Sequence, residues 1–559
     1  MSIQKNQSEQ LTGADVVVKT LEQHDVKWVF GVPGAKIDEV FNTLVDSSIQ
    51  TVVCRHEQNA AFIAGGIGRM TGKAGVAIAT SGPGISNLVT GLATANTEGD
   101  PIIALGGAVA LPDRLKKIHQ SMDSVSLCRP VTKYSVEVDS AESTSEVITN
   151  AFRSAESDRP GAAFVSLPMD IMVAPSKCEV LTPPAYSGFG PADATAIKEA
   201  ARLINQAKRP VVLLGLLASK PQNSAAVHEL IESKKLPVVG TFQAAGAVST
   251  NLFSNFAGRV GQINNQPADE LLAAGDLVIS IGYDPVEYWP SIWNKGNKRP
   301  IVHLDAQPAD IDNSYSPSVE LLGDIAATLR LLTPQVAHST PELSILGLLK
   351  KISADREELA RSSAALNGSP VHPLRLVSEL QKILTPDTTL CLDMGSFHLW
   401  MARNLYSFRA RQILISNGQQ TLGVALPWAI AATLVRPSEK VLSISGDGGF
   451  LFSAMELETA VRLQSNLVHM IWIDGTYDMV AVQEEQKYGR PSGTKFGPVD
   501  PVKYADAFGA RGFMIQSPDQ ITSVLKQAFD ASGPVLVGVH VDYSDNHKLF
   551  EHVNERNIH

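Results

Sequence analysis

Short apolar runs that end at a turn and lead into a helix-like stretch recur along the whole chain. The runs TVVC, GVAIAT and IIALGG come early, PVVLLG and DLVISIG come in the middle, and TTLCLDMG, VLSISGDGG and LVHMIWIDG come late. Such runs are typical of buried parallel strands, and the stretches between them are typical of crossover helices. We therefore expect an α/β protein with mostly parallel sheets that are flanked by helices.

The length of the chain, 559 residues, is too great for one ordinary domain. A linker with proline and serine, LTPPAYSGFGPAD at 181–193, separates the first block of strands from the second. A polar helical stretch at 349–370 separates the second block from the third. The sequence predicts three consecutive α/β domains, at residues 1–183, 190–345 and 368–550.

Composition and charge argue against several classes of protein. The net charge is −10 and no basic run stands out, so we expect no nucleic-acid partner. The N-terminus MSIQKNQSEQ lacks the apolar core of a signal peptide, and the longest apolar stretch is interrupted by Pro427. The cysteines show neither metal-ligand spacing nor a disulfide pattern and are interpreted as small buried residues: Cys54, Cys128, Cys178 and Cys391. We expect a cytoplasmic protein that does not bind a membrane.

Two aspartates follow successive apolar runs in the last block. Asp447 comes after the run that ends at Ile444, and Asp474 ends the next run, LVHMIWI. Neighbouring parallel strands would bring both carboxylates to one edge of a sheet, where they repel each other unless a cation or a proton lies between them. Oxygen ligands of this kind suit Mg²⁺. The alternative interpretation is a pair of turn-forming Asp-Gly steps, and these residues alone leave both open.

Glycine-rich turns elsewhere could bring the backbone close to a ligand. Gly448 and Gly449 would let backbone amides approach a diphosphate at a helix start. The segment SNGQQTLGVALPWAI, at 416–430, could contact an organic ring through its turn, and TSGPG is a tight turn before a helix. None of these patterns is diagnostic by itself.

Glu57 follows the apolar run at 51–54 and begins a stretch of small apolar residues. Burial would raise the pKa of its carboxyl and prepare it to share a proton with a ring nitrogen. The alternative is a glutamate that only favours a helix N-terminus. For His56, a packing role is the preferred interpretation.

Several motifs resemble a known family when they are taken together and in order. GDGGF…ELETA…WIDGTYDMV matches the metal motif, and RHEQNAAF matches the glutamate motif, of thiamine diphosphate-dependent enzymes related to acetohydroxyacid synthase and pyruvate oxidase. GVPGAKID, TSGPGISN, EGDPIIALGG and RPGAAFVSLP also align, and the resemblance extends from about residue 12 to 545. Within the family, HQSMD, TFQAAGAV, IGYDPVEY and DMGSFHLWMAR are most similar to the catabolic acetolactate synthases.

The resemblance implies a thiamine diphosphate-binding fold at both ends, a Rossmann-like middle domain and a role for each motif residue. Glu57 would contact the aminopyrimidine ring, and the carboxylates of Asp447 and Asp474 would hold Mg²⁺. Asp474 and Gly475 depart from the asparagines that are common in the family. The implied metal ligands are Asp447, Asp474 and the Thr476 carbonyl. The implied cofactor-binding residues are Glu57, Gly34, Ser396, Gln420, Leu422, Gly446, Asp447, Gly448, Gly449, Asp474, Thr476, Tyr477 and Met479.

The implied catalytic residues are Glu57, Gln120, Gln483 and Lys36, although Lys36 could instead be a solvated side chain at a helix start. Gln483 stands where biosynthetic relatives have a tryptophan that favours 2-oxobutyrate, so pyruvate is the expected donor and acceptor. The middle-domain segments LLGLLAS and IGYDPVEY lack the features that bind flavin in those relatives.

The resemblance therefore implies condensation of two pyruvate molecules to 2-acetolactate with release of carbon dioxide, for acetoin or butanediol formation. It implies a homodimer as the smallest active unit, a homotetramer as the assembly, and no regulatory subunit. Another thiamine diphosphate-dependent 2-oxo-acid decarboxylase or a pyruvate oxidase is the alternative within the family. A non-catalytic relative is the alternative outside enzymes, and retention of Glu57, Asp447 and Asp474 argues against it.

Overall fold

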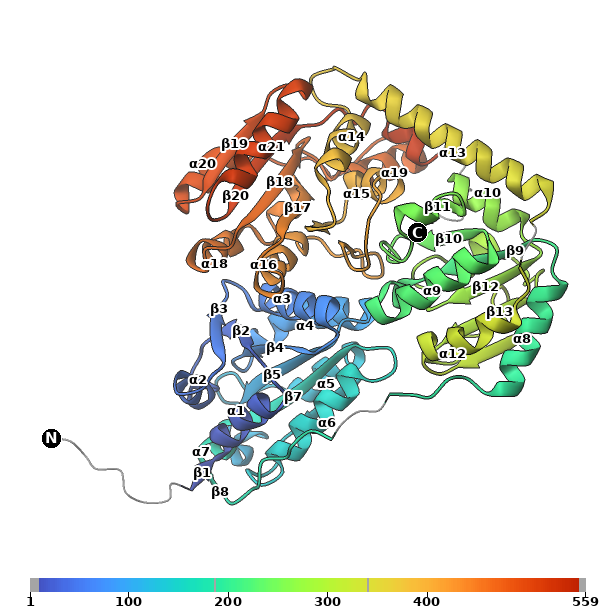
Figure 1. Ribbon diagram of the computed structural model, residues 1–559. Helices are drawn as coiled ribbons and strands as arrows, with labels where there is room; N and C mark the ends of the chain where they lie inside the picture. Colours follow the sequence, from blue (N-terminus) through green and yellow to red (C-terminus); the bar gives the residue numbers. More distant parts are fainter. Residues whose placement is uncertain (1–9, 185–187, 339–340, 552–559) are drawn as a thin grey trace. The chain divides into compact units, whose positions relative to one another are not determined.

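The computed structural model describes residues 10–184, 188–338 and 341–551 (Figure 1). The chain divides into two compact units, which are described separately. The first consists of residues 1–186 and 430–435, and the second consists of the rest of the chain. Among the described residues, no helix has the length and apolar character needed to cross a membrane.

The first unit is built on a six-stranded parallel sheet. Its strands are β2 (Trp28–Val32), β3 (Gln50–Val53), β4 (Gly75–Ala79), β5 (Ile102–Ala108), β6 (Tyr134–Glu137) and β7 (Ala162–Pro168), in the order β3-β2-β4-β5-β7-β6. Its helices are α1 (Gly13–Gln23), α2 (Asp38–Val45), α3 (Glu57–Thr71), α4 (Pro83–Glu98), α5 (Ser124–Cys128), α6 (Thr144–Glu156) and α7 (Met169–Val173). A short antiparallel pair, β1 (Leu11–Thr12) and β8 (Pro175–Ser176), lies outside this sheet.

Helices α3 and α4 pack closely against each other in the first unit. A Cβ atom at Gly91 of α4 would lie 2.3 Å from the Cβ of Ala61 in α3, so only glycine permits this approach. The buried face of α3 consists largely of small residues, which explains how a second helix can lie so near. The first residue of α3 is Glu57, and this packing brings α4 within reach of it.

The second unit contains two further six-stranded parallel sheets. The middle sheet has the order β11-β10-β9-β12-β13-β14 and consists of β9 (Pro210–Leu214), β10 (Val238–Thr241), β11 (Phe256–Val260), β12 (Leu277–Ile281), β13 (Ile301–Asp305) and β14 (Val319–Leu322). The helices of this part are α8 (Ala194–Gln206), α9 (Pro221–Lys234), α10 (Pro267–Ala274), α11 (Pro290–Trp293), α12 (Ile325–Leu332) and the long α13 (Leu343–Ala364).

The last sheet has the order β16-β15-β17-β18-β20-β19. Its strands are β15 (Thr388–Leu392), β16 (Ile413–Ile415), β17 (Lys440–Gly446), β18 (Leu467–Ile473), β19 (Arg511–Ile515) and β20 (Val535–His540). Its helices are α14 (Pro373–Ile383), α15 (Ser396–Asn404), α16 (Ala425–Val435), α17 (Asp447–Phe450), α18 (Leu457–Arg462), α19 (Asp478–Tyr488), α20 (Pro501–Ala507) and α21 (Ile521–Asp530). The last part of α16, residues 430–435, is grouped with the first unit.

Central strands of all three sheets are buried along their whole length, as β5, β9 and β18 illustrate. This is the reason why they appear in the sequence as unbroken apolar runs rather than as alternating patterns. The predicted fold class, α/β with mostly parallel sheets flanked by helices, is confirmed.

The middle and last sheets are joined within the second unit by a buried arginine. Arg259 lies in β11, and its guanidinium donates hydrogen bonds to the carbonyls of Ala402 (2.9 Å) and Leu405 (2.6 Å) at the end of α15. Burial lowers the pKa of Arg259 to about 10, so the side chain is still charged near neutral pH. Fixed contacts of this kind give one rigid wall to a pocket between the two sheets.

Candidate functional site

The two aspartates predicted to share a sheet edge are neighbours in the structure. Asp447 is the first residue after β17, and Asp474 is the first after β18. These strands are paired in parallel, with Gly446 opposite Trp472, so their carboxyl ends coincide. The Asp447 carboxylate accepts hydrogen bonds from the backbone N–H of Gly475 (2.8 Å) and of Gly448 (3.1 Å).

Electrostatic repulsion and burial act together on this pair. Burial and the nearby charges of Asp447 and Asp478 raise the pKa of Asp474 to about 8. Burial also raises the pKa of Asp447, against the effect of its backbone hydrogen bonds. The pair therefore retains a proton near neutral pH when nothing else balances its charge.

Oxygen atoms near this pair have no partner. The Asp474 Oδ2 and the Thr476 Oγ1 are buried and make no hydrogen bond in the described part of the chain. Buried polar atoms without partners are costly, and a bound cation would relieve that cost for a carboxylate. No group of three or more His, Cys, Asp or Glu side chains within the described ranges is arranged to hold a metal ion, so backbone oxygens would have to complete any site here.

The loop after β18 is held in place from two sides. The N–H of Tyr477 donates to the Thr494 carbonyl (2.9 Å), and the Tyr477 ring packs on Phe496 at 4.9 Å. The Asp478 carboxylate accepts hydrogen bonds from Ser396 and from the Asn546 amide. Ser396, one of the residues predicted to bind cofactor, thus contacts the start of α19 in the structure.

Glycines next to Asp447 make room for close approach. A Cβ at Gly448 would lie 2.7 Å from the Tyr477 ring, and one at Gly449 would lie 3.5 Å from the Asp393 carboxyl carbon. A Cβ at Gly446 would meet Phe397 only at 3.8 Å. The absence of a side chain at Gly448 therefore leaves the backbone of α17 accessible to a ligand. A larger residue at this position would displace Tyr477.

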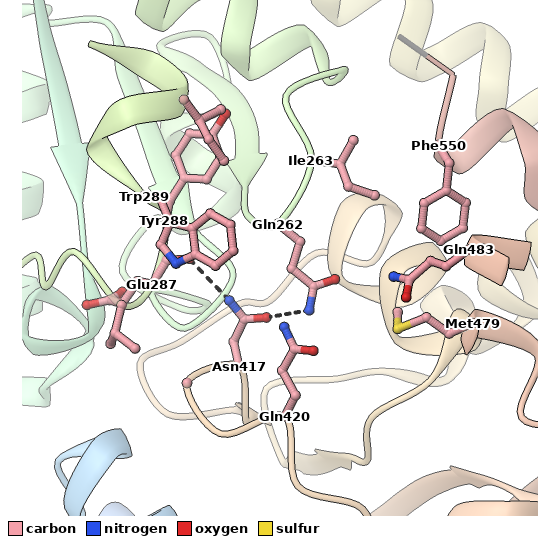
Figure 2. Close-up of a pocket in the computed structure, with 13 residues that line it drawn as sticks. Gln262, Ile263, Glu287, Tyr288, Trp289, Asn417, Gln420, Met479, Gln483 and Phe550 are labelled. Atoms are coloured by element: carbon pink, nitrogen blue, oxygen red, sulfur yellow. Dashed lines mark hydrogen bonds between the residues drawn. The ribbon is translucent and has the colours of Figure 1, made fainter. Parts of the chain in front are cut away.

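A pocket in the second unit gathers three of the predicted site residues, Gln420, Met479 and Gln483 (Figure 2). It lies between the middle and last sheets, and its other wall includes Gln262 and Trp289. Gln420 has a positive φ of 51°, which is uncommon outside glycine, and Leu422 nearby is half-buried. The pocket combines side-chain amides with apolar surface, as small-molecule sites usually do.

The remaining predicted residues belong to the first unit. Glu57 is 9% exposed, and its carboxylate accepts a hydrogen bond of 2.9 Å from the Asn87 amide on α4. Ser81 contacts the Gln120 side chain at 3.4 Å, and Gln120 has a positive φ of 62°.

Gly34 and Lys36 lie in the loop between β2 and α2. A Cβ at Gly34 would lie 2.7 Å from the Thr80 side chain, and Lys36 is half-buried. The role of Lys36 stays a prediction. Glu57, by contrast, has the burial and the polar partner expected of a carboxyl that gives and takes a proton.

Comparison with protein-family models matches all three parts of the chain. The models for the N-terminal TPP binding domain, the central domain and the C-terminal TPP binding domain of thiamine pyrophosphate enzymes match residues 11–127, 197–332 and 393–539. The chain is 53% identical to a catabolic acetolactate synthase of Raoultella terrigena over 537 residues, which cover 96% of each protein. The chain belongs to the acetolactate synthase family of thiamine pyrophosphate enzymes.

Other members of the family are also similar along nearly their whole length. An acetolactate synthase of Bacillus subtilis is 49% identical over 96% of this chain and 94% of its own. A probable acetolactate synthase large subunit of Methanococcus aeolicus is 30% identical over 96% of this chain and 92% of its own. The resemblance inferred from the motifs is confirmed, and the two outer domains are thiamine pyrophosphate-binding domains. The individual site residues stay predictions.

Asp393 is a residue of this site that the sequence reasoning missed. It follows β15 directly, and its buried carboxylate accepts hydrogen bonds from the N–H groups of Gly423 (2.9 Å) and Met394 (2.8 Å). Gly423 has a positive φ of 87° and comes directly after Leu422, so Asp393 fixes the turn that presents Leu422. The signal that marked Asp447 and Asp474, an aspartate at the end of an apolar run, was also present in TTLCLDMG.

The buried carboxyl of Asp393 should make stability depend on pH. Burial raises its pKa to about 7 in the folded protein, so the folded state holds a proton that the unfolded chain releases near pH 4. The stabilisation is complete below pH 4 and is lost as pH rises to 7, at up to about 1.4 kcal/mol per pH unit. Asp393→Asn should flatten this slope in denaturation midpoints measured from pH 4 to pH 8.

Asp276→Asn is the matched control, because Asp276 also accepts two backbone hydrogen bonds, from Lys208 (2.9 Å) and Arg209 (2.8 Å), but is more exposed. That variant should keep the slope of the unaltered protein. Equal slopes in the unaltered protein and in Asp393→Asn would contradict the assignment.

Proposed function

We propose that the chain is an acetolactate synthase that condenses two pyruvate anions, with uptake of one proton, into 2-acetolactate and carbon dioxide. The observation that carries this proposal is the 53% identity to a catabolic acetolactate synthase along 96% of both chains. The product is a precursor for acetoin or butanediol. The chemistry that thiamine diphosphate supplies when bound is a nucleophilic carbon and an electron sink, and the protein positions, shields and moves protons around it.

Mg²⁺ fits the acidic pair at the ends of β17 and β18. The Asp447 and Asp474 carboxylates and the carbonyl of Thr476 would hold the ion, which would take the place of the proton that the pair otherwise retains. The buried Asp474 Oδ2 without a partner supports this assignment. The backbone amides of Gly448 and Gly449 and the Tyr477 side chain would bind a diphosphate, with Gly446 and Ser396 beside them.

Glu57 would hold and return a proton on the aminopyrimidine ring of the cofactor. Glu57 is buried, and the Asn87 amide binds its Oε2, so Oε1 would be left for the ring. Gly34, the backbone of Gln420, Leu422 and Met479 would contact the same cofactor. Gln120, Gln483 and Lys36 would contact pyruvate, with the half-buried Gln483 amide binding its carboxylate.

The crevice where the middle sheet would bind a dinucleotide is filled by a carboxylate of the chain itself, which supports a flavin-free enzyme. Open parallel sheets bind ligands where the strand order reverses, here beyond the ends of β9 and β12. The buried Glu287 lies there and accepts hydrogen bonds from the N–H groups of Leu216 (2.9 Å) and Asp284 (3.1 Å) and from the Thr241 hydroxyl (2.5 Å). Its negative charge takes the place that a diphosphate would need.

The assembly and the location of the protein are proposed from the family alone. A homodimer would be the smallest active unit, because Glu57 and the acidic pair would come from different subunits, and a homotetramer would be the complete assembly. No regulatory subunit is expected, and the protein would act in the cytoplasm. The domain limits 1–183, 190–345 and 368–550 are part of the same proposal.

Product analysis tests the proposed reaction. With thiamine diphosphate and Mg²⁺, the protein should convert pyruvate to 2-acetolactate, and an equal mixture of pyruvate and 2-oxobutyrate should still yield mainly 2-acetolactate. The reason is that Gln483 offers no large apolar surface to the extra methylene, a contact worth about 1–3 kcal/mol. Acetaldehyde or acetyl phosphate as the main product would favour a decarboxylase or an oxidase, and acetohydroxybutyrate would contradict the assignment of Gln483.

Loss of the first metal ligand should be visible without turnover. Asp447→Ala removes one of two carboxylates, so calorimetric titration with Mg²⁺ in the presence of thiamine diphosphate should show binding weakened by at least tenfold. Asp500→Ala is the control, since Asp500 only caps α20 at the surface. Similar Mg²⁺ affinity in both variants, with intact circular dichroism, would show that the acidic pair is not the metal site.

The role of Glu57 can be measured on the cofactor itself. Glu57→Gln keeps the size and the Asn87 contact but cannot share a proton, so hydrogen–deuterium exchange at the reactive thiazolium carbon should slow by roughly a hundredfold. Glu156→Gln is the control, because Glu156 accepts a hydrogen bond from Ala74 (2.8 Å) in the same unit. Exchange at an unchanged rate in Glu57→Gln would remove Glu57 from the mechanism.

A further inference from the structure

We propose that Gln262 is a substrate-contacting residue whose side-chain oxygen accepts a hydrogen bond from the hydroxyl group of the hydroxy acid that the reaction forms. The inference rests on the proposed function, because it assigns the pocket of Figure 2 to that reaction. Gln262 lines the pocket together with Gln420, Met479 and Gln483. No motif in the sequence singled it out.

The backbone of Gln262 is strained in a way that aims its side chain. It lies just beyond the end of β11 with a φ of 57°, and the N–H of Ile263 donates to the Gly261 carbonyl at 2.6 Å across it. A tight turn of this kind with positive φ is rare for residues other than glycine, because a side chain disfavours it. Gln420, which lines the same pocket, also has a positive φ. Unfavourable backbone conformations cluster at functional sites, and two residues of this kind line the pocket.

The orientation of the Gln262 amide follows from its neighbours. The carbonyl of Glu287 can only accept, so the Asn417 Nδ2 must face it, at 3.1 Å. The Asn417 Oδ1 therefore faces Gln262, whose Nε2 donates to it at 3.1 Å. The second hydrogen of that Nε2 is directed to the sulfur of Met394, at 4.0 Å. The Nε2 is thus fully used, and the amide cannot flip without losing both contacts.

The chain of contacts ends on a rigid support. Asn417 is buried, and the Glu287 side chain is held by the N–H groups of Leu216 and Asp284 and by the Thr241 hydroxyl. The same residue therefore binds the ends of middle-domain strands with its carboxylate and orients Asn417 with its carbonyl. The Gln262 amide is therefore held through its Nε2, and its Oε1 is preorganised to bind a ligand in the pocket.

The atom that Gln262 presents to the pocket is an acceptor. Its Oε1 receives no hydrogen bond from the part of the chain that the structure describes, and Figure 2 shows it turned toward the side of the pocket that carries Gln483. Pyruvate at neutral pH has no hydrogen-bond donor, whereas 2-acetolactate has a tertiary hydroxyl. A fixed acceptor therefore contributes to binding the hydroxy acid and not to binding free pyruvate.

Two stable acids that differ only in one hydroxyl test this assignment. Calorimetry on the holoenzyme would compare 2-hydroxy-2-methylpropanoate with 2-methylpropanoate as probes. The unaltered protein should bind the hydroxy acid about tenfold more tightly, as expected for one net hydrogen bond. Gln262→Leu should abolish that preference and leave the affinity for 2-methylpropanoate nearly unchanged.

Gln262→Gly guards against misfolding, because glycine relieves the positive φ while it removes the amide. This variant should lose the preference and keep the melting temperature of the unaltered protein. Gln464→Leu is the matched control: Gln464 also has a positive φ, of 53°, but is exposed outside the pocket, and its variant should retain the preference.

The inference is overturned if the unaltered protein shows no preference, or if both Gln262 variants keep it. A failure of the proposed reaction itself is distinguished by the product analysis, in which the unaltered protein would then form no 2-acetolactate from pyruvate.

Discussion

Carboxylates held close together at the ends of parallel strands are the interaction on which the site depends. Strands β15, β17 and β18 are neighbours in the last sheet, and each is followed directly by an aspartate: Asp393, Asp447 and Asp474. Parallel pairing makes this convergence unavoidable, because every strand of such a sheet ends on the same side. Negative charges removed from water must be neutralised, paired or protonated.

The chain meets that requirement in different ways at different positions. Asp393 accepts backbone hydrogen bonds that fix the turn next to Leu422, and burial raises its pKa to about 7, so it holds a proton in more acidic solution. Asp447 also accepts two backbone hydrogen bonds, and Asp474 leaves one buried oxygen without a partner. The Asp393 carboxyl thus positions a loop, whereas the Asp447–Asp474 pair is the proposed cation site.

Central features of the fold were predictable from the sequence because they depend on strong local signals. Strands buried on both faces appear as apolar runs, and the aspartates that end them appear beside glycines. Five strands at the edges of their sheets come from none of these runs: β6, β11, β14, β16 and β19. An edge strand is buried partly by loops and helices that are distant in the sequence, so its own residues carry a weaker local pattern.

The residues of the site divide in the same manner. Asp447, Asp474 and Glu57 stand at element boundaries and could be proposed from sequence, whereas the direction of the Gln262 amide depends on Asn417 and on a carbonyl more than a hundred residues away from it. Such an orientation is a property of contacts between sheets, so it becomes visible only once the sheets are assembled. Asp393 is the intermediate case, since its position was marked in the sequence but its hydrogen bonds to the turn after Leu422 were not.

The Glu287 carboxylate has an evolutionary consequence. An exchange of flavin for this side chain would be difficult to reverse. Removing Glu287 alone would leave three buried donors without their acceptor, namely the N–H groups of Leu216 and Asp284 and the Thr241 hydroxyl. A return to nucleotide binding would require the crevice to reopen and a cationic partner to appear in the same step. Each change by itself would leave buried polar groups without partners, so the two changes would have to occur together.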